Sequence, residues 1–400
     1  MTATIDGTAL PVTVEAFHAL PAGFEYGSDT YGSYMYGAGA GTGPEQWQPI
    51  TCAAVSVDML RGTTDASRIV PVEQLLIELS DPELEVFQFS HTGSPILTRL
   101  EIADLIRVTV AGQPIITARI ESITEQQRPA AGRLVTIEAF GLASDYAFQT
   151  QRGTRPSETA IERANALIAP TPYLGQVYTD TPAKTVWPAE DVEISLLQEL
   201  DALAASQAAV FRTARNGDAR FDPYPAPYSG NGWTVTDSCD TAGLVPVRID
   251  WVGDQQQQLN IVRVDVDTGT DVMPVEVSDT LSINYYGPRD AARGFPAAVF
   301  TQSPTDATRF VGYVLDRAKL AVNRPGTIEF DTQTGTDWAN MLPTLDVDQS
   351  VDVHRTRATS LPTVWRCIIC GYRLVITPTQ PGAVRVAGEL FLETIETSTT

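Results

Sequence analysis

Cys367 and Cys370 are the residues best placed to do chemistry, because they have the C-x-x-C spacing of zinc ligands and thiol redox pairs. They lie within an apolar, strand-like run at residues 363–376, where an odd separation directs two side chains to opposite faces. Redox motifs of this kind begin a helix, which stabilises the thiolate. We therefore expect two buried structural thiols, with no metal site and no redox pair.

Other metal ligands are scattered along the chain. No second C-x-x-C motif and no H-x₃₋₅-H spacing occurs; the remaining cysteines and histidines are Cys52, Cys239, His18, His91 and His354. Four cysteines are too few to hold together a fold of 400 residues, so reduced thiols are expected. The sequence predicts no bound metal and no cofactor.

Hydrolytic chemistry also lacks a recognisable setting. Tyr26-Gly27-Ser28 has no strand-turn-helix context, and no G-x-S-x-G motif occurs. Asp265, Asp267 and Asp271 come near a calcium loop but are too widely spaced. One acidic run, residues 72–85, holds Glu73, Glu78, Asp81, Glu83 and Glu85. We interpret such runs as a solvated acidic face and predict no enzyme, with no catalytic, cofactor-binding or metal-binding residue.

The charge of the chain restricts its partners. The net charge is -22, and apart from Lys184 and Lys319 every one of its 27 basic residues is an arginine. This balance opposes non-specific binding to phosphate backbones and to anionic membranes. No basic, apolar leader and no run of 18 apolar residues is present, so we expect neither a signal peptide nor membrane insertion.

The elements that would position these residues change in type along the chain. Residues 1–44 are interpreted as an arm, because residues 23–43 consist mostly of Gly, Tyr, Ser, Ala and Thr without apolar periodicity. The arm could pack on a neighbouring subunit or be a flexible linker. Residues 45–150 show period-two alternation with turn signals at 111–114 and 128–132, which predicts an antiparallel barrel or sandwich.

Residues 151–244 are expected to form a small α+β domain. One amphipathic helix is predicted from Ala160 to Ile168, capped by Thr154 or Ser157. A second helix, over residues 196–204, follows a capping box made by Ser195 and Gln198. After it, Asn216-Gly217 predicts a two-residue hairpin turn.

Residues 245–400 again show strand patterns, closing with a hairpin at 377–382. One helix is marked by Ser303, Pro304 and Asp306 and should end near Asn323, before Pro325. The predicted fold class is mainly β with an α+β insertion: two tube-like antiparallel β-barrel or sandwich domains flank the small α+β domain, and one helix packs on the second barrel.

Several stretches in order resemble the minor tail or baseplate-hub proteins of long-tailed, siphovirus-type bacteriophages, especially those of actinobacterial hosts. They are TCAAVSVDMLRG, LIRVTVAGQPIITARIESITEQQRPAAGRLVTIEAFGLASDYA, ISLLQELDALAASQAAVFRTARNGDARFDP, LNIVRVDVDTG, SDTLSINYYGPRD, LDVDQSVDVHR and GYRLVITPTQPGAVRVAGELFLE. The resemblance covers about residues 45–398 and rests on order and spacing. Residues 1–44 do not match the pattern.

The resemblance implies a tail-tip hub, assembled in the host cytoplasm and carried in the virion. Three chains would form a homotrimer whose barrels make a ring beneath the distal tail protein or tail tube. Tip, fibre or receptor-binding proteins would lie below it, the tape measure protein is a possible further partner, and DNA would pass without specific binding. Two alternatives stay open: a β-rich carbohydrate-binding or carbohydrate-active protein, and a capsid or tube subunit with a single barrel.

Overall fold

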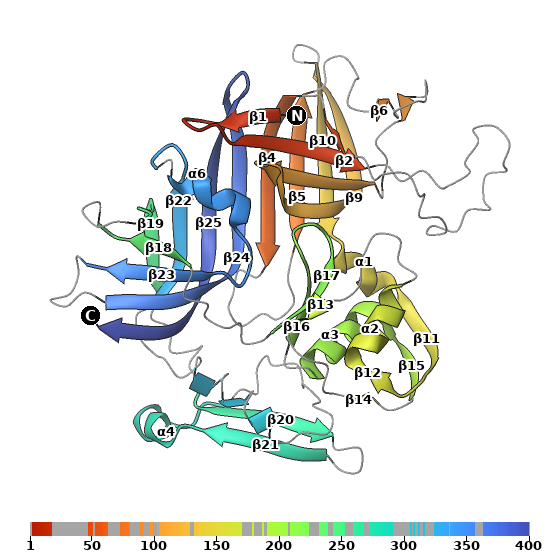
Figure 1. Ribbon diagram of the computed structural model, residues 1–400, viewed down its shortest axis with the longest axis vertical. Helices are drawn as coiled ribbons and strands as arrows, with labels where there is room; N and C mark the ends of the chain where they lie inside the picture. The colour runs from red at the N-terminus through yellow and green to blue at the C-terminus, as the bar shows by residue number, and fades with distance from the viewer. Residues whose placement is uncertain are drawn as a thin grey trace.

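The computed structural model describes residues 2–17, 47–50, 53–62, 73–80, 89–90, 97–98, 102, 104–128, 132–169, 178–179, 186–187, 190–206, 209–223, 232–238, 243–252, 259–267, 272–290, 305, 307–308, 311–312, 315–316, 324–335, 337–356 and 363–399. Strands dominate this part of the chain (Figure 1), which confirms the prediction of a mainly β protein with an α+β insertion. Three of the described helices lie between residues 143 and 206, and others lie among the later strands, at residues 280–286 and 337–341.

A closed ring of paired strands makes up most of the 14-stranded main sheet. In order around the ring these are β24 (Thr363–Gln380), β4 (Ala53–Gly62), β5 (Gln74–Ser80), β10 (Gly132–Gly141), β9 (Gln113–Arg128), β8 (Leu105–Val110), β2 (Pro11–Phe17), β1 (Thr2–Ile5) and β25 (Ala383–Thr399), which pairs again with β24. The pairing of β1 with β25 is parallel. Alternating apolar residues such as Leu75, Ile77 and Leu79 of β5 are fully buried, as period two requires.

Residues 2–17 belong to this ring, which differs from the expected arm at residues 1–44. β2 pairs with β8, and β1 joins β2 to β25. Ile5, Val12 and Val14 are buried in the main core. The alternation in PVTVEAF is a normal half-buried strand pattern, too short to stand out beside the Gly/Tyr-rich stretch. Residues 18–46, and with them the Tyr-rich stretch at 23–43, lie outside the described residues.

The long hairpin of β24 and β25 continues from the ring into a second group of strands. That group runs β18 (Trp233–Thr236), β23 (Ser350–Arg355), β24, β25, β22 (Arg324–Asp331) and β19 (Arg248–Val252). This group curls so that its two edges approach each other. The ring centroids of Trp251 on β19 and Trp365 on β24 are 6.1 Å apart, and the guanidinium of Arg355 on β23 lies over the Trp251 ring. Buried residues of both groups form one cluster, so the two expected barrels share a core as well as a hairpin.

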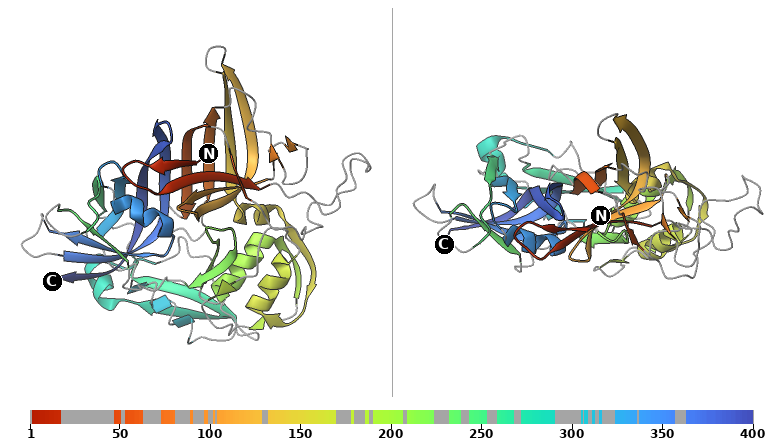
Figure 2. Two further views of the ribbon diagram at one scale, coloured as in Figure 1. Left: turned by 45° about the horizontal axis from the view of Figure 1, so that its top comes forward. Right: turned by 90° about the horizontal axis from the view of Figure 1, so that it is seen from above.

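Residues 143–223 fold into a helical unit with small sheets, here called the middle domain. Its helices are α1 (Ala143–Phe148), α2 (Ala160–Ile168) and α3 (Leu196–Ser206), and its strands are β11 (Thr150–Arg155), β12 (Glu158–Thr159), β13 (Tyr178–Thr179), β14 (Val186–Trp187), β15 (Glu190–Ser195), β16 (Ala209–Thr213) and β17 (Ala219–Pro223). It lies beside the ring in two views (Figures 1 and 2). Its buried residues form a cluster separate from the main core.

The helix caps of the middle domain follow local sequence signals. The capping box of Ser195 and Gln198 is present, with reciprocal bonds of 3.3 and 3.2 Å, as predicted. At α2 the prediction of Thr154 or Ser157 was wrong: Thr159 is the N-cap, and it forms a capping box with Glu162. The T-x-x-E signal was present in the sequence and directly precedes the helix.

A separate two-stranded ribbon consists of β20 (Ile261–Asp267) and β21 (Val272–Ser278), followed by α4 (Thr280–Tyr286). Of the helix expected from Ser303 to Asn323, the structure describes helical residues at 305, 307–308, 311–312 and 315–316. Ala307, Val311 and Leu315 pack on valines of the ribbon. The helix therefore covers the ribbon rather than the second group of strands.

The remaining elements are short. They are β3 (Gln48–Pro49), β6 (Phe89–Ser90), β7 (Leu97–Thr98), α6 (Asp337–Met341) and the 3-10 turn η1 (Leu342–Thr344). No helix in the described part of the chain is long and apolar enough to cross a membrane.

Hairpin turns agree with the sequence signals in two places and differ in one. Ala111 and Gly112 both have positive φ, as a two-residue turn between β8 and β9 requires, and Gly382 with φ 80° closes the hairpin of β24 and β25. The Asn216-Gly217 turn is longer than predicted. Ala214 donates its N–H to Asp218 O, so residues 215–217 form the tip.

Candidate functional site

The two cysteines lie at irregular points of the pairing between β24 and β25. Cys367 is buried and its Sγ is 3.7 Å from Thr394 Oγ1, whereas Cys370 is half-buried and is skipped in the register, which makes it a bulge. Both are free thiols. Burial raises the pKa of the Cys367 thiol to about 12, which opposes thiolate chemistry there.

The other candidate ligands do not converge in the described residues. His354 is half-buried on β23, while His18, His91, Cys52 and Cys239 lie outside the described part. The described residues contain no group of three or more His, Cys, Asp or Glu side chains suited to a metal ion. Asp265 is exposed on β20, and Asp271 is not among the described residues.

The acidic residues of the run at 72–85 differ in burial, which the composition of the run did not indicate. Glu78 is half-exposed on β5 and accepts a hydrogen bond from Ser56, in keeping with a solvated face. Glu73 is an exception, because only 9% of its surface is exposed. Asp81, Glu83 and Glu85 lie outside the described residues. The structure thus singles out one buried carboxyl from this run.

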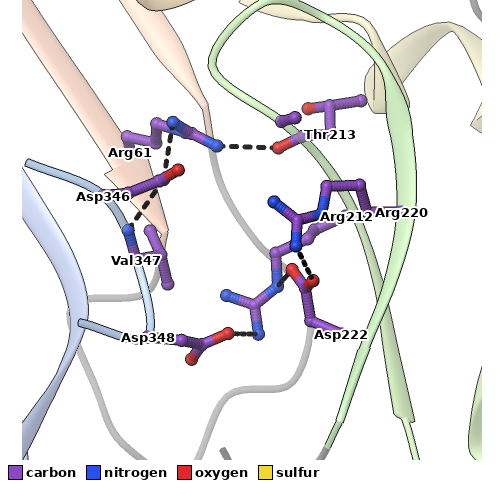
Figure 3. Close-up of a pocket in the computed structure, with 9 residues that line it drawn as sticks. Arg61, Arg212, Thr213, Arg220, Asp222, Asp346, Val347 and Asp348 are labelled. Atoms are coloured by element: carbon purple, nitrogen blue, oxygen red, sulfur yellow. Dashed lines mark hydrogen bonds and ion pairs between the residues drawn. The ribbon is translucent and has the colours of Figure 1, made fainter. Parts of the chain in front are cut away.

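Glu73 pairs with Arg61, which lies in a cluster of charged residues where three distant parts of the chain meet (Figure 3). The parts are the end of β4 with Glu73 just before β5, the β16–β17 hairpin, and the loop at residues 345–348 after η1. Gly62, at the end of β4 with φ 75°, permits a close approach here. A Cβ at this position would lie 2.3 Å from the carbonyl oxygen of the Cys370 bulge.

Arg61 is the centre of the cluster and is only 2% exposed. Its Nε lies 3.1 Å from Glu73 Oε1, and its Nη1 lies 2.9 Å from Asp346 Oδ1. Its Nη2 donates to the carbonyl oxygen of Thr213 at 2.8 Å. The planar guanidinium of Arg61 therefore binds all three parts of the chain at once. A lysine ammonium does not offer donors in this fixed planar arrangement.

Two neutral groups complete the surroundings of Arg61. Thr213 Oγ1 donates to the second carboxyl oxygen of Glu73, and Tyr372 donates its hydroxyl to Ile115 O at 3.1 Å. Burial raises the pKa of the Glu73 carboxyl, an effect that the Arg61 guanidinium opposes. Burial likewise raises the pKa of Tyr372 to about 12, so its phenol stays neutral at ordinary pH.

A second set of ion pairs surrounds the first. Arg212 pairs with Asp222 of its own hairpin at 3.1 Å and with Asp348 at 2.9 Å. Arg220 pairs with Asp222 at 3.1 Å (Figure 3). Arg215, at the hairpin tip, lies 3.4 Å from Asp346 and donates to Pro343 O at 2.7 Å.

The arrangement suits a structural joint better than a reaction centre. Four arginines (61, 212, 215 and 220) face four carboxylates (73, 222, 346 and 348), so the charges balance. The hollow between them holds about 70 Å³, well below the roughly 300–1,000 Å³ of small-molecule sites. Sequence reasoning missed this cluster. The one available signal was the use of Arg in place of Lys, which favours buried, multidentate pairs.

Comparison with known proteins identifies the fold. No family model and no curated protein matches the chain. Among solved structures, the tail protein from Neisseria meningitidis MC58 aligns with 96% of this chain and 97% of its own, at a TM-score of 0.57 and 13% identity. The 43 kDa tail protein of prophage MuSo2 from Shewanella oneidensis covers 86% of this chain and 95% of its own, at a TM-score of 0.53 and 11% identity. The chain therefore has the fold of these two tail proteins.

Proposed function

We propose that the protein is a structural component of a bacteriophage tail and that it forms the tail-tip hub. The observation that carries the proposal is the fold match along nearly the whole length of two tail proteins. The order of motifs over residues 45–398 supports it independently, because it is a property of the sequence alone. The role is one of assembly and passage rather than catalysis, in keeping with a charged cluster whose members are paired with one another.

The hub would be a homotrimer. Each chain contributes the closed strand ring and the curled second group, joined by the β24–β25 hairpin. Three chains would then supply six barrel-like units, enough to match a sixfold tail tube through closed heterologous contacts. The tail tube or distal tail protein would lie above, tip, fibre or receptor-binding proteins below, and the tape measure protein is a further candidate partner.

The ribbon region offers a surface for contacts between copies. Helix α4 has no buried side chain, and a helix of seven residues is not stable without packing. Leu281 and Tyr285 are 83% and 84% exposed. This helix carries no charge, so two copies of a chain with net charge -22 could meet here without bringing carboxylates together.

The acidic composition suits the passage of DNA. A bore lined with carboxylates repels phosphates, so that DNA slides through without specific binding. In this proposal the protein is carried in the virion at the tail tip after assembly in the host cytoplasm. Lysine substitutions on the bore wall should leave the trimer intact and slow genome release at low salt.

A carbohydrate-binding protein is the alternative, and it would present exposed tryptophans in a groove. Trp338 and Trp365 are buried, and Trp47, Trp233 and Trp251 are half-buried. Trp338 stacks on Phe330 at 4.6 Å and donates its indole N–H to Val245 O. Four of these side chains belong to the main core or pack against it, and Trp47 packs on Phe17 and Arg107, so they do not favour the alternative.

The mass in solution tests the hub proposal. Sedimentation equilibrium of the purified chain should give three times the 43.3 kDa of one chain. Leu281→Ser combined with Tyr285→Ser should shift the mass toward monomer. Val55→Ser removes an exposed apolar side chain from β4 and serves as the control. A wild-type monomer at every concentration would overturn the hub role and leave only the shared fold.

A further inference from the structure

The middle domain and the rest of the molecule, here called the body, have separate apolar cores. In the described residues, the buried cluster of the middle domain is formed by side chains between Tyr146 and Phe221, and none of its members belongs to the main core. The chain enters the middle domain at Gly141–Leu142, directly after β10. The relative position of the two units must therefore be fixed largely by other contacts.

The tip of the β16–β17 hairpin provides such contacts to the first group of strands. Arg61 and Glu73 of the body bind the carbonyl and hydroxyl oxygens of Thr213. Thr117 of β9 donates its hydroxyl to Arg215 O at 2.8 Å. Hydrogen bonds and a buried charge pair thus connect the tip to the body at this junction.

The same tip also contacts residues 343–348, which lead into β23 of the second group of strands. Arg215 lies against Pro343 O and Asp346, and Arg212 pairs with Asp348. Asp348 is held in place because its N–H donates to Ile369 O of β24, next to the Cys370 bulge. One hairpin tip therefore contacts both parts of the body, the strand ring and the loop that leads into the second group of strands; these two parts are here called the halves of the body.

An ionic joint of this kind behaves differently from an apolar one. Its groups are stable only while every partner is present, since a buried charge that loses its partner is strongly destabilising. Losing one pair therefore favours exposure of the whole junction to water. The two cores on either side keep their own packing, because they share no member.

We propose that the β16–β17 hairpin tip is an ionic latch that holds the middle domain against both halves of the body. When its ion pairs to the body are lost, the middle domain separates from the body as a folded unit. Such a device lets one part of the chain move without unfolding. The inference rests on the junction alone and does not depend on the hub role.

Hydrogen exchange with mass spectrometry tests the latch on the full chain. Arg212→Gln removes the ion pair with Asp348, and Arg215→Gln removes the ion pair with Asp346 together with the hydrogen bonds to Pro343 O and Leu345 O. The matched control is Arg220→Gln, which removes an arginine from the same hairpin that pairs with Asp222 within β17. In both latch variants, exchange at residues 213–218 and 342–348 should rise by about fivefold or more, while α2 and α3 keep their protection.

Small-angle scattering provides the second measurement, with a larger radius of gyration expected in the two latch variants and no change in Arg220→Gln. Three results would overturn the proposal. The first is unchanged exchange at the tip in both latch variants. The second is equal loss of protection in α2 and α3, which would show unfolding instead of release. The third is an Arg220→Gln effect as large as that of Arg212→Gln, because contacts with the body would then be irrelevant.

Discussion

Asp348 is the residue at which the ionic joint responds to pH. Its carboxyl is placed against Arg212 by a loop with φ 68° at Asp348 itself. Burial raises the pKa of Asp348 to about 6, the nearby Arg212 lowers it, and Asp222, Asp346 and Glu393 raise it further. The folded protein therefore holds a proton at Asp348 over a pH range in which the unfolded chain has released it.

Asp348→Asn should change the pH dependence of stability in a defined direction. Because the pKa of the folded state is the higher one, wild-type stability falls as pH rises from about 4 to about 6. Relative to the variant, the free energy of unfolding of the wild type should fall by about 1 to 3 kcal/mol between about pH 4 and about pH 6. Urea unfolding at several pH values measures it, with exposed Asp265→Asn on β20 as the control. Parallel curves for wild type and Asp348→Asn would contradict the assignment.

Cys367 should be inert as a thiol while the protein is folded. Its high pKa and its burial at 0% exposure leave almost no accessible thiolate at pH 8. A disulfide reagent should therefore label Cys367 only after unfolding, as followed by peptide mass mapping. Rapid labelling in the native protein, or stoichiometric zinc in elemental analysis, would show that this cysteine is chemically active.

At the scale of elements, the start of helix α2 depends on one capping residue. Thr159 accepts the N–H of Glu162, and the Glu162 carboxylate accepts the N–H of Thr159 at 2.9 Å. Thr159→Ala should lower the stability of the middle domain by about 1 kcal/mol. Ser157→Ala, two residues earlier, should have little effect. The midpoints of chemical unfolding compare the two variants, and equal losses would argue against Thr159 as the cap.

The first strand is required to close the ring. Ile5 is fully buried, and β1 is the only described link between β2 and β25. Ile5→Ala should cost about 2 to 5 kcal/mol, as for other large-to-small changes in a core. Thr4→Ala, on the half-exposed face of the same strand, should cost far less. If both variants unfold like wild type, residues 2–5 contribute nothing to the core and the arm interpretation of residues 1–44 would return.

At the scale of the whole molecule, charge opposes assembly. Copies with net charge -22 repel one another, and salt screens this repulsion. Self-association should therefore strengthen between about 50 and 500 mM salt, opposite to the behaviour of complexes held by ion pairs. Sedimentation across this range measures the effect. Weaker association at high salt would show that the copies are joined by complementary charges instead of by neutral surfaces such as α4.

The sequence by itself determined the features that depend on neighbouring residues. Period-two alternation predicted the strands that follow Trp47, and the apolar stripe from Ala160 predicted α2. The capping box at Ser195 and the turns at Ala111 and Pro381 also followed from local patterns. These signals are readable because helix periodicity, capping and turn conformations involve residues only a few positions apart.

Tertiary structure alone decided what depends on distant residues. The pairing of β1 with β25 places Thr4 and Ile5 beside Ala383 and Val384, and no local pattern encodes that choice. The bulge at Cys370 likewise arises where β24 leaves one partner strand for another. Arg61, Thr213 and Asp346 meet only after three segments pack together. In the sequence they look like surface residues, because the burial that makes them a joint is a property of the assembled fold.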